Sequence, residues 1–243
     1  MNTRGYHDKL RPIRLDRVPL EERSCAAAVM GLDLAAEVDW LLRAVTSLAS
    51  PVVFSHNDVN TGNILVRYMH DLSTSILKLR IFRDENKHSD PVVLIDFEFS
   101  SYNYRGFDIA NHFNEWMYDY RRKDYPYYFR NTDKFPRREQ QETFVRTYVA
   151  TFLEQQTIIR ENNGLEVGDL GSKKSSLSIE KSILREVSVF CLASHLLWTL
   201  WSLKQAQTSN IPFAYYSFAK DRMEDYRDLK VQALADISEP SKL

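Results

Sequence analysis

Helical patterns of apolar residues cover most of the chain. Between residues 33 and 49, apolar side chains recur every three or four positions, and Asp33 can cap the first turn. The same spacing predicts an amphipathic helix over 137–161, whose apolar stripe holds Phe144, Val145, Tyr148, Val149 and Phe152. Residues 179–207 are apolar on almost all sides from Val187 onward, which predicts a long buried helix. A last helix is expected over 218–234.

Short apolar runs between these helices predict a few strands. Residues 51–54 and 63–68 have the pattern of short strands on either side of a loop. Residues 76–82 alternate between apolar and polar positions, and 91–97 have the pattern of a buried strand. A helix is expected over 107–118, followed by an irregular stretch.

The amino-terminal residues show less pattern, because Pro12 and Pro19 interrupt any helix there. The sequence therefore predicts an α+β protein in which a helical body carries a few short strands. Residues 1–50 are expected to form an irregular segment plus a helix, and 51–243 the main domain.

Composition limits the class of protein. The 243 residues are 44% hydrophobic and 27% charged, with a net charge of −1, as in an ordinary globular protein. No charge excess indicates binding to nucleic acid or to an anionic membrane. The two cysteines favour a reduced, cytoplasmic protein. The charged first 24 residues do not predict a signal peptide, and the apolar run over 189–201 is too short to span a bilayer.

Two apolar runs end on acidic residues. In "FSHNDVNTGNILV" (54–66), Asp58 and Asn63 flank a loop between two strand-like runs, and Asp96 ends the run that begins at residue 92. A phosphoryl-transfer site needs one carboxylate to orient the attacking hydroxyl, and an Asn with a second carboxylate to hold Mg²⁺. The alternative is an Asx-turn, in which Asp58 and Asn63 only satisfy backbone groups. The second acidic strand end favours the phosphoryl-transfer site.

These motifs resemble those of a known family. "HNDVNTGNILV" together with "LIDFEF" resembles the signature that choline/ethanolamine kinases share with aminoglycoside phosphotransferases. "SSYNYRGFDIANHFNEWMYDY", "LASHLLWTLWSLKQAQ" and "FAYYSFAKDRMEDY" are similar to segments of eukaryotic choline kinases. The resemblance runs from about residue 51 to about residue 226. It implies a protein-kinase-like fold with ATP, Mg²⁺ and choline as ligands, and a homodimer.

The resemblance also implies roles for individual residues. Asp58 is expected to be the catalytic carboxylate, and Asn63 and Asp96 the ligands of Mg²⁺. Glu98, which stands where protein kinases carry Gly, is expected to help hold the metal. Asn60 departs from the family, which usually has Gln there.

Aromatic residues supply what a quaternary ammonium site needs. Trp198 and Trp201 are three positions apart and therefore lie on one face of their helix. A quaternary ammonium has no N–H group, so aromatic faces and nearby negative charge must hold it. Core packing is the alternative for such a pair. The resemblance implies that the residues around choline are Glu115, Tyr120, Trp198, Trp201 and Phe218, with Phe99 and Phe213 as further candidates.

Other polar residues are expected to be structural. Arg105 and Asp108 are expected to form a local ion pair or cap, and His56 to brace the loop before Asp58 by hydrogen bonds. His112 and His195 are expected to be packing histidines with satisfied ring nitrogens.

The nucleotide-covering part of a kinase is not recognisable. Only 55 residues (56 − 1) precede His56, whereas a separate lobe has on the order of 100. They contain no G-x-G-x-x-G and no Lys in a strand-like run. We therefore expect mainly a helical carboxy-terminal lobe, with apolar surface exposed around 52–54 and 92–95.

Two functions remain open from the sequence. One is an ATP-dependent choline kinase that makes phosphocholine for phosphatidylcholine synthesis, with ethanolamine as the alternative substrate. The other is a truncated, non-catalytic lobe that binds choline or a partner protein. Binding of ATP with Mg²⁺ would distinguish them.

Overall fold

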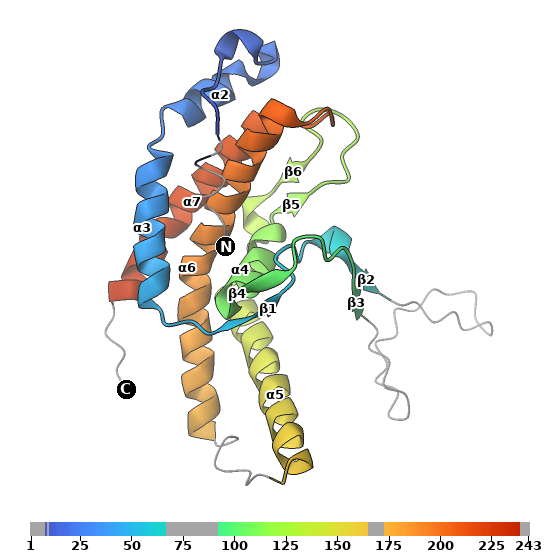
Figure 1. Cartoon of the computed structure of the whole chain (residues 1–243), viewed down its shortest axis with the longest axis vertical. Coiled ribbons are helices and arrows are strands. Elements are labelled where there is room, and N and C mark those ends of the chain that lie inside the picture. The colour runs from blue at the N-terminus through green and yellow to red at the C-terminus, as the bar shows by residue number, and fades with distance from the viewer. Residues whose placement is uncertain (1–7, 9, 67–91, 165–172, 239–243) are drawn as a thin grey trace, which may run out of the picture.

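The computed structural model describes residues 8, 10–66, 92–164 and 173–238 (Figure 1). The strand predicted over 76–82 lies outside these residues, as does the end of the strand predicted over 63–68.

One long helix, α6, runs through the middle of the molecule (Figure 1). The buried side chains around it include Phe107, Phe190 and Leu200. Four other helices pack against α6 or its neighbours; the bounds of the five are α3 (Leu34–Ser47), α4 (Arg105–Glu115), α5 (Arg138–Asn162), α6 (Lys173–Thr208) and α7 (Tyr215–Ser238). All five correspond to helices that the sequence predicts. Asp33 caps α3 as expected, because its side chain accepts a hydrogen bond from the Ala36 amide at 3.0 Å.

The position of α6 explains its composition. Among the described helices, the segment Ser175–Thr208 of α6 is long enough and apolar enough to cross a membrane. However, 83% of its apolar 18-residue stretch is buried inside the protein. A core helix surrounded by other helices is apolar on all sides for the same reason.

The apolar stripe of α5 is divided between core and surface. Val145 and Val149 are buried against the core, as predicted, and Leu153 joins them. Phe144 and Phe152 are exposed at 37% and 42%, so the prediction that they share the buried stripe is wrong. These two rings lie on a neighbouring face of the helix.

The strands form three small antiparallel pairs. They are β1 (Val52–Ser55) with β4 (Ser101–Tyr104), β2 (Ile64–Val66) with β3 (Val92–Leu94), and β5 (Tyr118–Asp119) with β6 (Phe129–Arg130). β4 and the β5–β6 pair lie where the sequence predicts no strand. The helix predicted over 107–118 ends earlier, at Glu115, and Tyr118 begins β5. The prediction of a buried strand over 91–97 is wrong, because β3 pairs only with β2 among the described residues and its side chains are exposed.

The apolar exposure expected around these strands is confirmed. Val52 is 59% exposed, Phe54 65% and Val92 47%. Phe54 packs edge-on against Tyr102 of β4, with ring centroids 6.1 Å apart.

The amino-terminal segment contains structure that the sequence pattern does not predict. Two 3₁₀ turns, Leu15–Arg17 and Leu20–Glu22, lead into a helix, α2 (Arg23–Met30), which contacts α7. The buried Glu22 carboxylate accepts hydrogen bonds from the Tyr216 amide at 2.8 Å and the Ser217 amide at 3.3 Å. It therefore caps the start of α7 from 194 residues away in the sequence.

Candidate active site

The loop after β1 brings Asp58 and Asn63 together. Asn63 Nδ2 donates to Asp58 Oδ2 at 3.0 Å and to the Asp58 carbonyl oxygen at 2.9 Å. Asn60 Nδ2 donates to Asp58 Oδ1 at 3.0 Å, and Asn60 Oδ1 accepts from the Gly62 amide at 2.8 Å. The loop closes with a 3₁₀ turn over Thr61–Asn63. Both oxygens of Asp58 are thus oriented by amide donors within its own loop.

Helix α4 anchors the loop that carries Asp58 through the side chain of Asp108. Asp108 accepts hydrogen bonds from the backbone amides of His56, at 2.7 Å, and Asn57, at 2.6 Å. This bidentate contact fixes Asn57 in the left-handed region, with φ of 67°, a conformation that Asn tolerates better than most residues. The predicted Arg105–Asp108 pair is wrong. Arg105 instead forms a salt bridge with the buried Glu186 of α6, because its side chain lies on the α6 side of the first turn of α4.

His56 and Asn57 connect the loop to the chain that follows β3. His56 Nε2 lies 2.9 Å from the Ile95 carbonyl oxygen, so the predicted bracing role of His56 is confirmed. Asn57 Nδ2 donates to the Phe99 carbonyl oxygen at 2.9 Å and to Ser101 Oγ at 3.0 Å. These contacts hold the Asp58 loop and the segment after β3 as one unit.

Asp96 and Glu98 lie in that segment and are exposed. Ile64 pairs with Leu94, and the Ile95 amide donates to the Asn63 carbonyl oxygen at 3.0 Å. Ile95 therefore lies opposite Asn63, and Asp96 is the next residue. Asp96 has φ of 64°, which is unusual for a residue other than Gly and marks a constrained turn.

The donor set at this turn suits a hard cation. Asn63 uses its Nδ2 on Asp58, which leaves the amide oxygen to face a cation, and Asp96 and Glu98 add carboxylate oxygens. Mg²⁺ prefers such oxygen ligands and keeps several waters, so exposed carboxylates fit it. No group of three or more His, Cys, Asp or Glu side chains converges on a metal position within the ranges that the structure describes.

Burial makes Asp58 an unusually basic carboxylate. Desolvation raises its pKa from 3.8 to about 6, and the charge of Glu115 adds to this. The hydrogen bonds from Asn60 and Asn63 and the proximity of His56 oppose the shift. A carboxylate with a pKa near 6 is mostly ionised at neutral pH and accepts a proton more readily than an exposed aspartate.

Asp58 opens onto a cavity of about 530 Å³. All seven side chains that the sequence assigns to choline line it, although they come from four separate segments. The cavity is lined by Asp58, Asn60, Glu98, Phe99, Glu115, Tyr120, Trp198, Trp201, Lys204, Gln205, Ile211, Phe213, Tyr215 and Phe218. Asp96 and Asn63 are not among these residues.

The aromatic side chains enclose one end of the cavity at edge-to-face angles. Trp198 and Trp201 have ring centroids 5.5 Å apart and planes at 79°, and Phe99 meets Trp198 at 5.6 Å and 74°. Trp201 also contacts Tyr215, which is not among the residues predicted to bind choline, with ring centroids 6.1 Å apart. The indole of Trp198 donates to Asn111 Oδ1 at 2.8 Å, which fixes its ring. The ring faces of such a wall can hold a cation without hydrogen bonds.

The acid in this wall already has a cationic partner. Glu115 is 3% exposed and forms a salt bridge with Arg222 of α7. Sequence reasoning did not identify Arg222, and no local signal marks a pair 107 residues apart.

The two helical histidines differ from one another. His112 Nδ1 lies 3.2 Å from the Val59 carbonyl oxygen, in line with a packing role. His195 is fully buried, and neither ring nitrogen has a hydrogen-bond partner among the described residues, so the expectation that it is satisfied is wrong. Burial and the nearby Arg222 lower the pKa of His195 well below its usual value, so the ring stays neutral.

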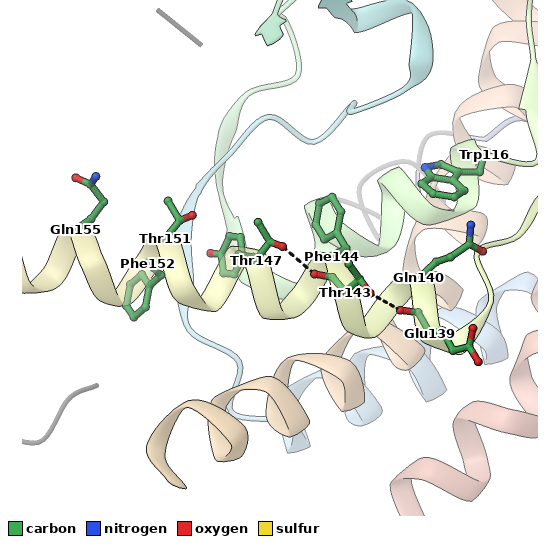
Figure 2. Close-up of a pocket in the computed structure, with 10 residues that line it drawn as sticks. Trp116, Glu139, Gln140, Thr143, Phe144, Thr147, Thr151, Phe152 and Gln155 are labelled. Atoms are coloured by element: carbon green, nitrogen blue, oxygen red, sulfur yellow. Dashed lines mark hydrogen bonds between the residues drawn. The ribbon is translucent and has the colours of Figure 1, made fainter. Parts of the chain in front are cut away.

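A larger cavity, of about 890 Å³, lies elsewhere (Figure 2). It follows the outer face of α5, where Phe144, Phe152 and a row of threonines meet Trp116 at the end of α4. Among the described residues that line it, Glu139 is the one acidic residue, and none of the predicted site residues is present. Asp58 and the residues predicted to bind choline therefore line the smaller cavity and not this one.

Comparison with known proteins gives one family throughout. The family model described as "Choline/ethanolamine kinase" matches residues 10–227. Choline kinase alpha of Mus musculus is 41% identical over 202 residues, which cover 83% of this chain and 39% of the mouse protein. Choline/ethanolamine kinase of Homo sapiens is 38% identical over 196 residues, or 81% of this chain and 42% of the human protein. Ethanolamine kinase of Drosophila melanogaster is 33% identical over 199 residues, or 82% and 30%.

Solved structures show the same fold. A choline kinase from Cryptosporidium parvum Iowa II superposes with a TM-score of 0.57 at 23% identity, over 97% of this chain and 55% of the other. An ethanolamine kinase from Plasmodium vivax gives a TM-score of 0.59 at 21% identity, over 93% and 47%. The predicted α+β, kinase-like fold with a mainly helical lobe is confirmed.

The match covers most of this chain but only part of each relative. The family model covers most of the chain, whereas the chain spans less than half the length of these curated relatives. The predicted resemblance is nevertheless confirmed by sequence and by fold, and the chain belongs to the choline/ethanolamine kinase family.

Proposed function

We propose that this chain is the choline-binding and catalytic part of an ATP-dependent choline kinase. One observation carries the proposal. A single cavity joins Asp58, the carboxylate with a raised pKa, to a wall of aromatic side chains that suits a quaternary ammonium. A choline molecule in this cavity would place its ammonium among the rings and its hydroxyl toward Asp58.

Asp58 is proposed to orient the choline hydroxyl and to accept its proton. The choline oxygen forms a bond to the γ-phosphorus of ATP, the bond from that phosphorus to the β–γ bridging oxygen breaks, and ADP leaves. Asn60 and Asn63 hold the two Asp58 oxygens in place for this step.

Asn63 and Asp96, with Glu98 beside them, are proposed to hold Mg²⁺. Asn63 directly precedes β2, and Asp96 follows Ile95, whose amide donates to the Asn63 carbonyl oxygen just beyond the β2–β3 pair. The cation would neutralise charge on the phosphates of ATP when both are bound.

Trp198, Trp201 and Tyr120 are proposed to hold the ammonium group, with Phe99, Phe213 and Phe218 completing the wall and Glu115 behind it. A cation over a desolvated aromatic face gains about 2 kcal/mol or more. Cytoplasmic location is part of the proposal, and the free thiols of Cys25 and Cys191 support a reducing compartment.

The first experiment is calorimetric titration of this chain with choline. We expect saturable binding, which Trp201→Ala weakens and Asp58→Asn spares. Absence of binding up to millimolar choline would contradict the proposal for this cavity.

The second experiment tests transfer. ATP consumption with choline is measured in a coupled assay for this chain and for a version extended upstream to the length of the relatives. The 243-residue chain, which spans less than half the length of these relatives, is expected to show little turnover, because positioning of the phosphates supplies most of the catalysis in kinases. In the extended protein, Asp58→Asn should lower turnover by roughly 10²–10⁴-fold, the usual contribution of a general base.

The alternative, a non-catalytic lobe that binds choline or a partner protein, predicts choline binding without turnover in both versions. Ethanolamine in place of choline in the same assay tests the other substrate, which the relatives named ethanolamine kinases keep open.

A further inference from the structure

Arg222 lies behind the aromatic wall of the active-site cavity and is fully buried. Its Nη2 donates to Glu115 Oε1 and to the Tyr120 hydroxyl oxygen, the latter at 3.0 Å. The Tyr120 hydroxyl in turn donates to Glu115 Oε2 at 2.8 Å. The three side chains form a closed triangle in which Glu115 and Tyr120 line the cavity and Arg222 does not.

The guanidinium also occupies aromatic faces. Its Cζ lies 3.8 Å from the ring centroid of Tyr118 and 4.7 Å from that of Phe218. These are the contacts that a ligand cation would make with a ring. Arg222 is therefore a resident cation, built into the same cluster of rings that faces the cavity.

The Tyr120 hydroxyl keeps its proton in this arrangement. Burial, together with the charge of Glu115, raises the pKa of Tyr120 well above its usual value, so the hydroxyl remains a donor to Glu115. Each oxygen of Glu115 thus accepts one hydrogen bond from the protein, and its negative charge is matched by Arg222 in direct contact.

This arrangement treats two kinds of ammonium differently. A primary ammonium carries three N–H donors, and burying them without acceptors is costly. A quaternary ammonium has no N–H donor, so pairing of the nearby carboxylate costs it only part of an electrostatic attraction and no hydrogen bond. A carboxylate without its arginine would be a far better partner for the primary ammonium, because hydrogen bonds between charged groups are strong.

We propose that Arg222 is a positioning residue that neutralises Glu115 and fixes Tyr120, and that it thereby makes the cavity prefer quaternary over primary ammonium compounds. The inference rests on the proposed function, since it takes this cavity as the binding site of an amino alcohol.

The test compares the affinities of the chain for choline and for ethanolamine by calorimetry at neutral pH. Arg222→Met removes the charge and keeps the apolar stem. The ratio of choline to ethanolamine affinity should move toward ethanolamine by about tenfold or more, the factor that one hydrogen bond to a charged group commonly carries. Arg222→Lys keeps the charge and should keep the ratio close to that of the wild type.

The double variant Glu115→Gln with Arg222→Met isolates the cause. It leaves no free carboxylate, so the ratio should return to within about threefold of the wild-type value. Replacing both members of a buried ion pair by neutral residues is also commonly tolerated by the fold. Lys230→Met is the matched control. It breaks another partly buried ion pair of α7, with Glu37 of α3, and neither residue lines the cavity. It should lower thermal stability without changing the ratio.

If Arg222→Met does not melt cooperatively, Arg222→Gln replaces it, because its amide can still donate to Glu115 but carries no charge. The same shift of the ratio is expected. An unchanged ratio in a folded, uncharged Arg222 variant would overturn the role of Arg222 and leave choline binding intact. A wild-type chain that binds neither amine would instead overturn the proposed function, and this inference with it.

Discussion

Replacing Asp58 by asparagine should stabilise the folded chain, even though the proposed function requires the carboxylate. Burial raises the pKa of Asp58 from 3.8 to about 6, which means that the folded state holds a proton there more tightly than the unfolded state. Such a group destabilises the fold wherever it is ionised. The penalty is absent below pH 3.8, grows as the pH rises to about 6, and is constant above that value.

The magnitude follows from the shift. A difference of about 2.2 units (about 6 − 3.8) at about 1.4 kcal/mol per unit is about 3 kcal/mol at pH 8. Asparagine removes this penalty but can accept only one of the two hydrogen bonds that Asn60 and Asn63 now donate. The lost bond costs about 1 kcal/mol. The net gain at pH 8 is therefore roughly 2 kcal/mol, and it should be smaller at pH 5 by about 1.4 kcal/mol.

The assay is urea denaturation of both proteins at pH 8 and pH 5, with EDTA present so that no cation binds at the loop. Asp124→Asn, at an exposed position between β5 and β6, is the control and should change stability little at either pH. A destabilised Asp58→Asn variant at pH 8, or a gain that is the same at both pH values, would refute the argument from burial.

Four further predictions test other parts of the structure. Trp201→Ala should weaken choline binding roughly thirtyfold, the equivalent of about 2 kcal/mol, and ethanolamine binding less; equal losses by calorimetry would favour core packing. Asp96→Ala in the extended protein should raise the Mg²⁺ concentration needed for turnover or abolish turnover, and a wild-type Mg²⁺ titration would exclude the metal role. Gly106→Ala should cost about 1–3 kcal/mol by overpacking, because an added Cβ would lie 2.5 Å from Phe190 Cδ2; Gly31→Ala, whose nearest atom would be 3.5 Å away, is the control, and equal thermal stability of the two variants would contradict the contact. Glu22→Gln should cost about 1–2 kcal/mol by weakening the cap of α7, whereas the exposed Glu21→Gln should cost little; melting temperatures that fall equally would show that the cap does not matter.

Local patterns explain which parts of the fold the sequence predicts. The spacing of apolar residues reveals α3, α5, α6 and α7, because each helix buries a stripe against the same core. The sequence pattern does not predict helix α2, since its eight residues are too few and too rich in alanine to show an apolar stripe. The strand β3 has the composition of a buried strand, but burial depends on what covers it, which its own residues do not encode.

The same limit applies to the site. The spacing within one loop predicts that Asp58 and Asn63 face each other, and the structure has them in hydrogen-bond contact. The Glu22 cap on α7 and the Arg222–Glu115 pair join residues 194 and 107 positions apart. Each partner alone looks like an ordinary surface charge, so only the folded chain reveals them.

Helix α4 is the element that couples the two ends of the cavity. Asp108 in its first turn holds the loop of Asp58, and Glu115 in its last turn belongs to the aromatic wall. The two residues are seven positions apart (115 − 108), two turns of a helix, so they lie on one face about 10 Å apart. The contact of Gly106 with Phe190 and the Arg105–Glu186 salt bridge fix α4 on α6, which carries Trp198 and Trp201. The loop that carries Asp58 and the aromatic wall are therefore both anchored on the same pair of packed helices, α4 and α6.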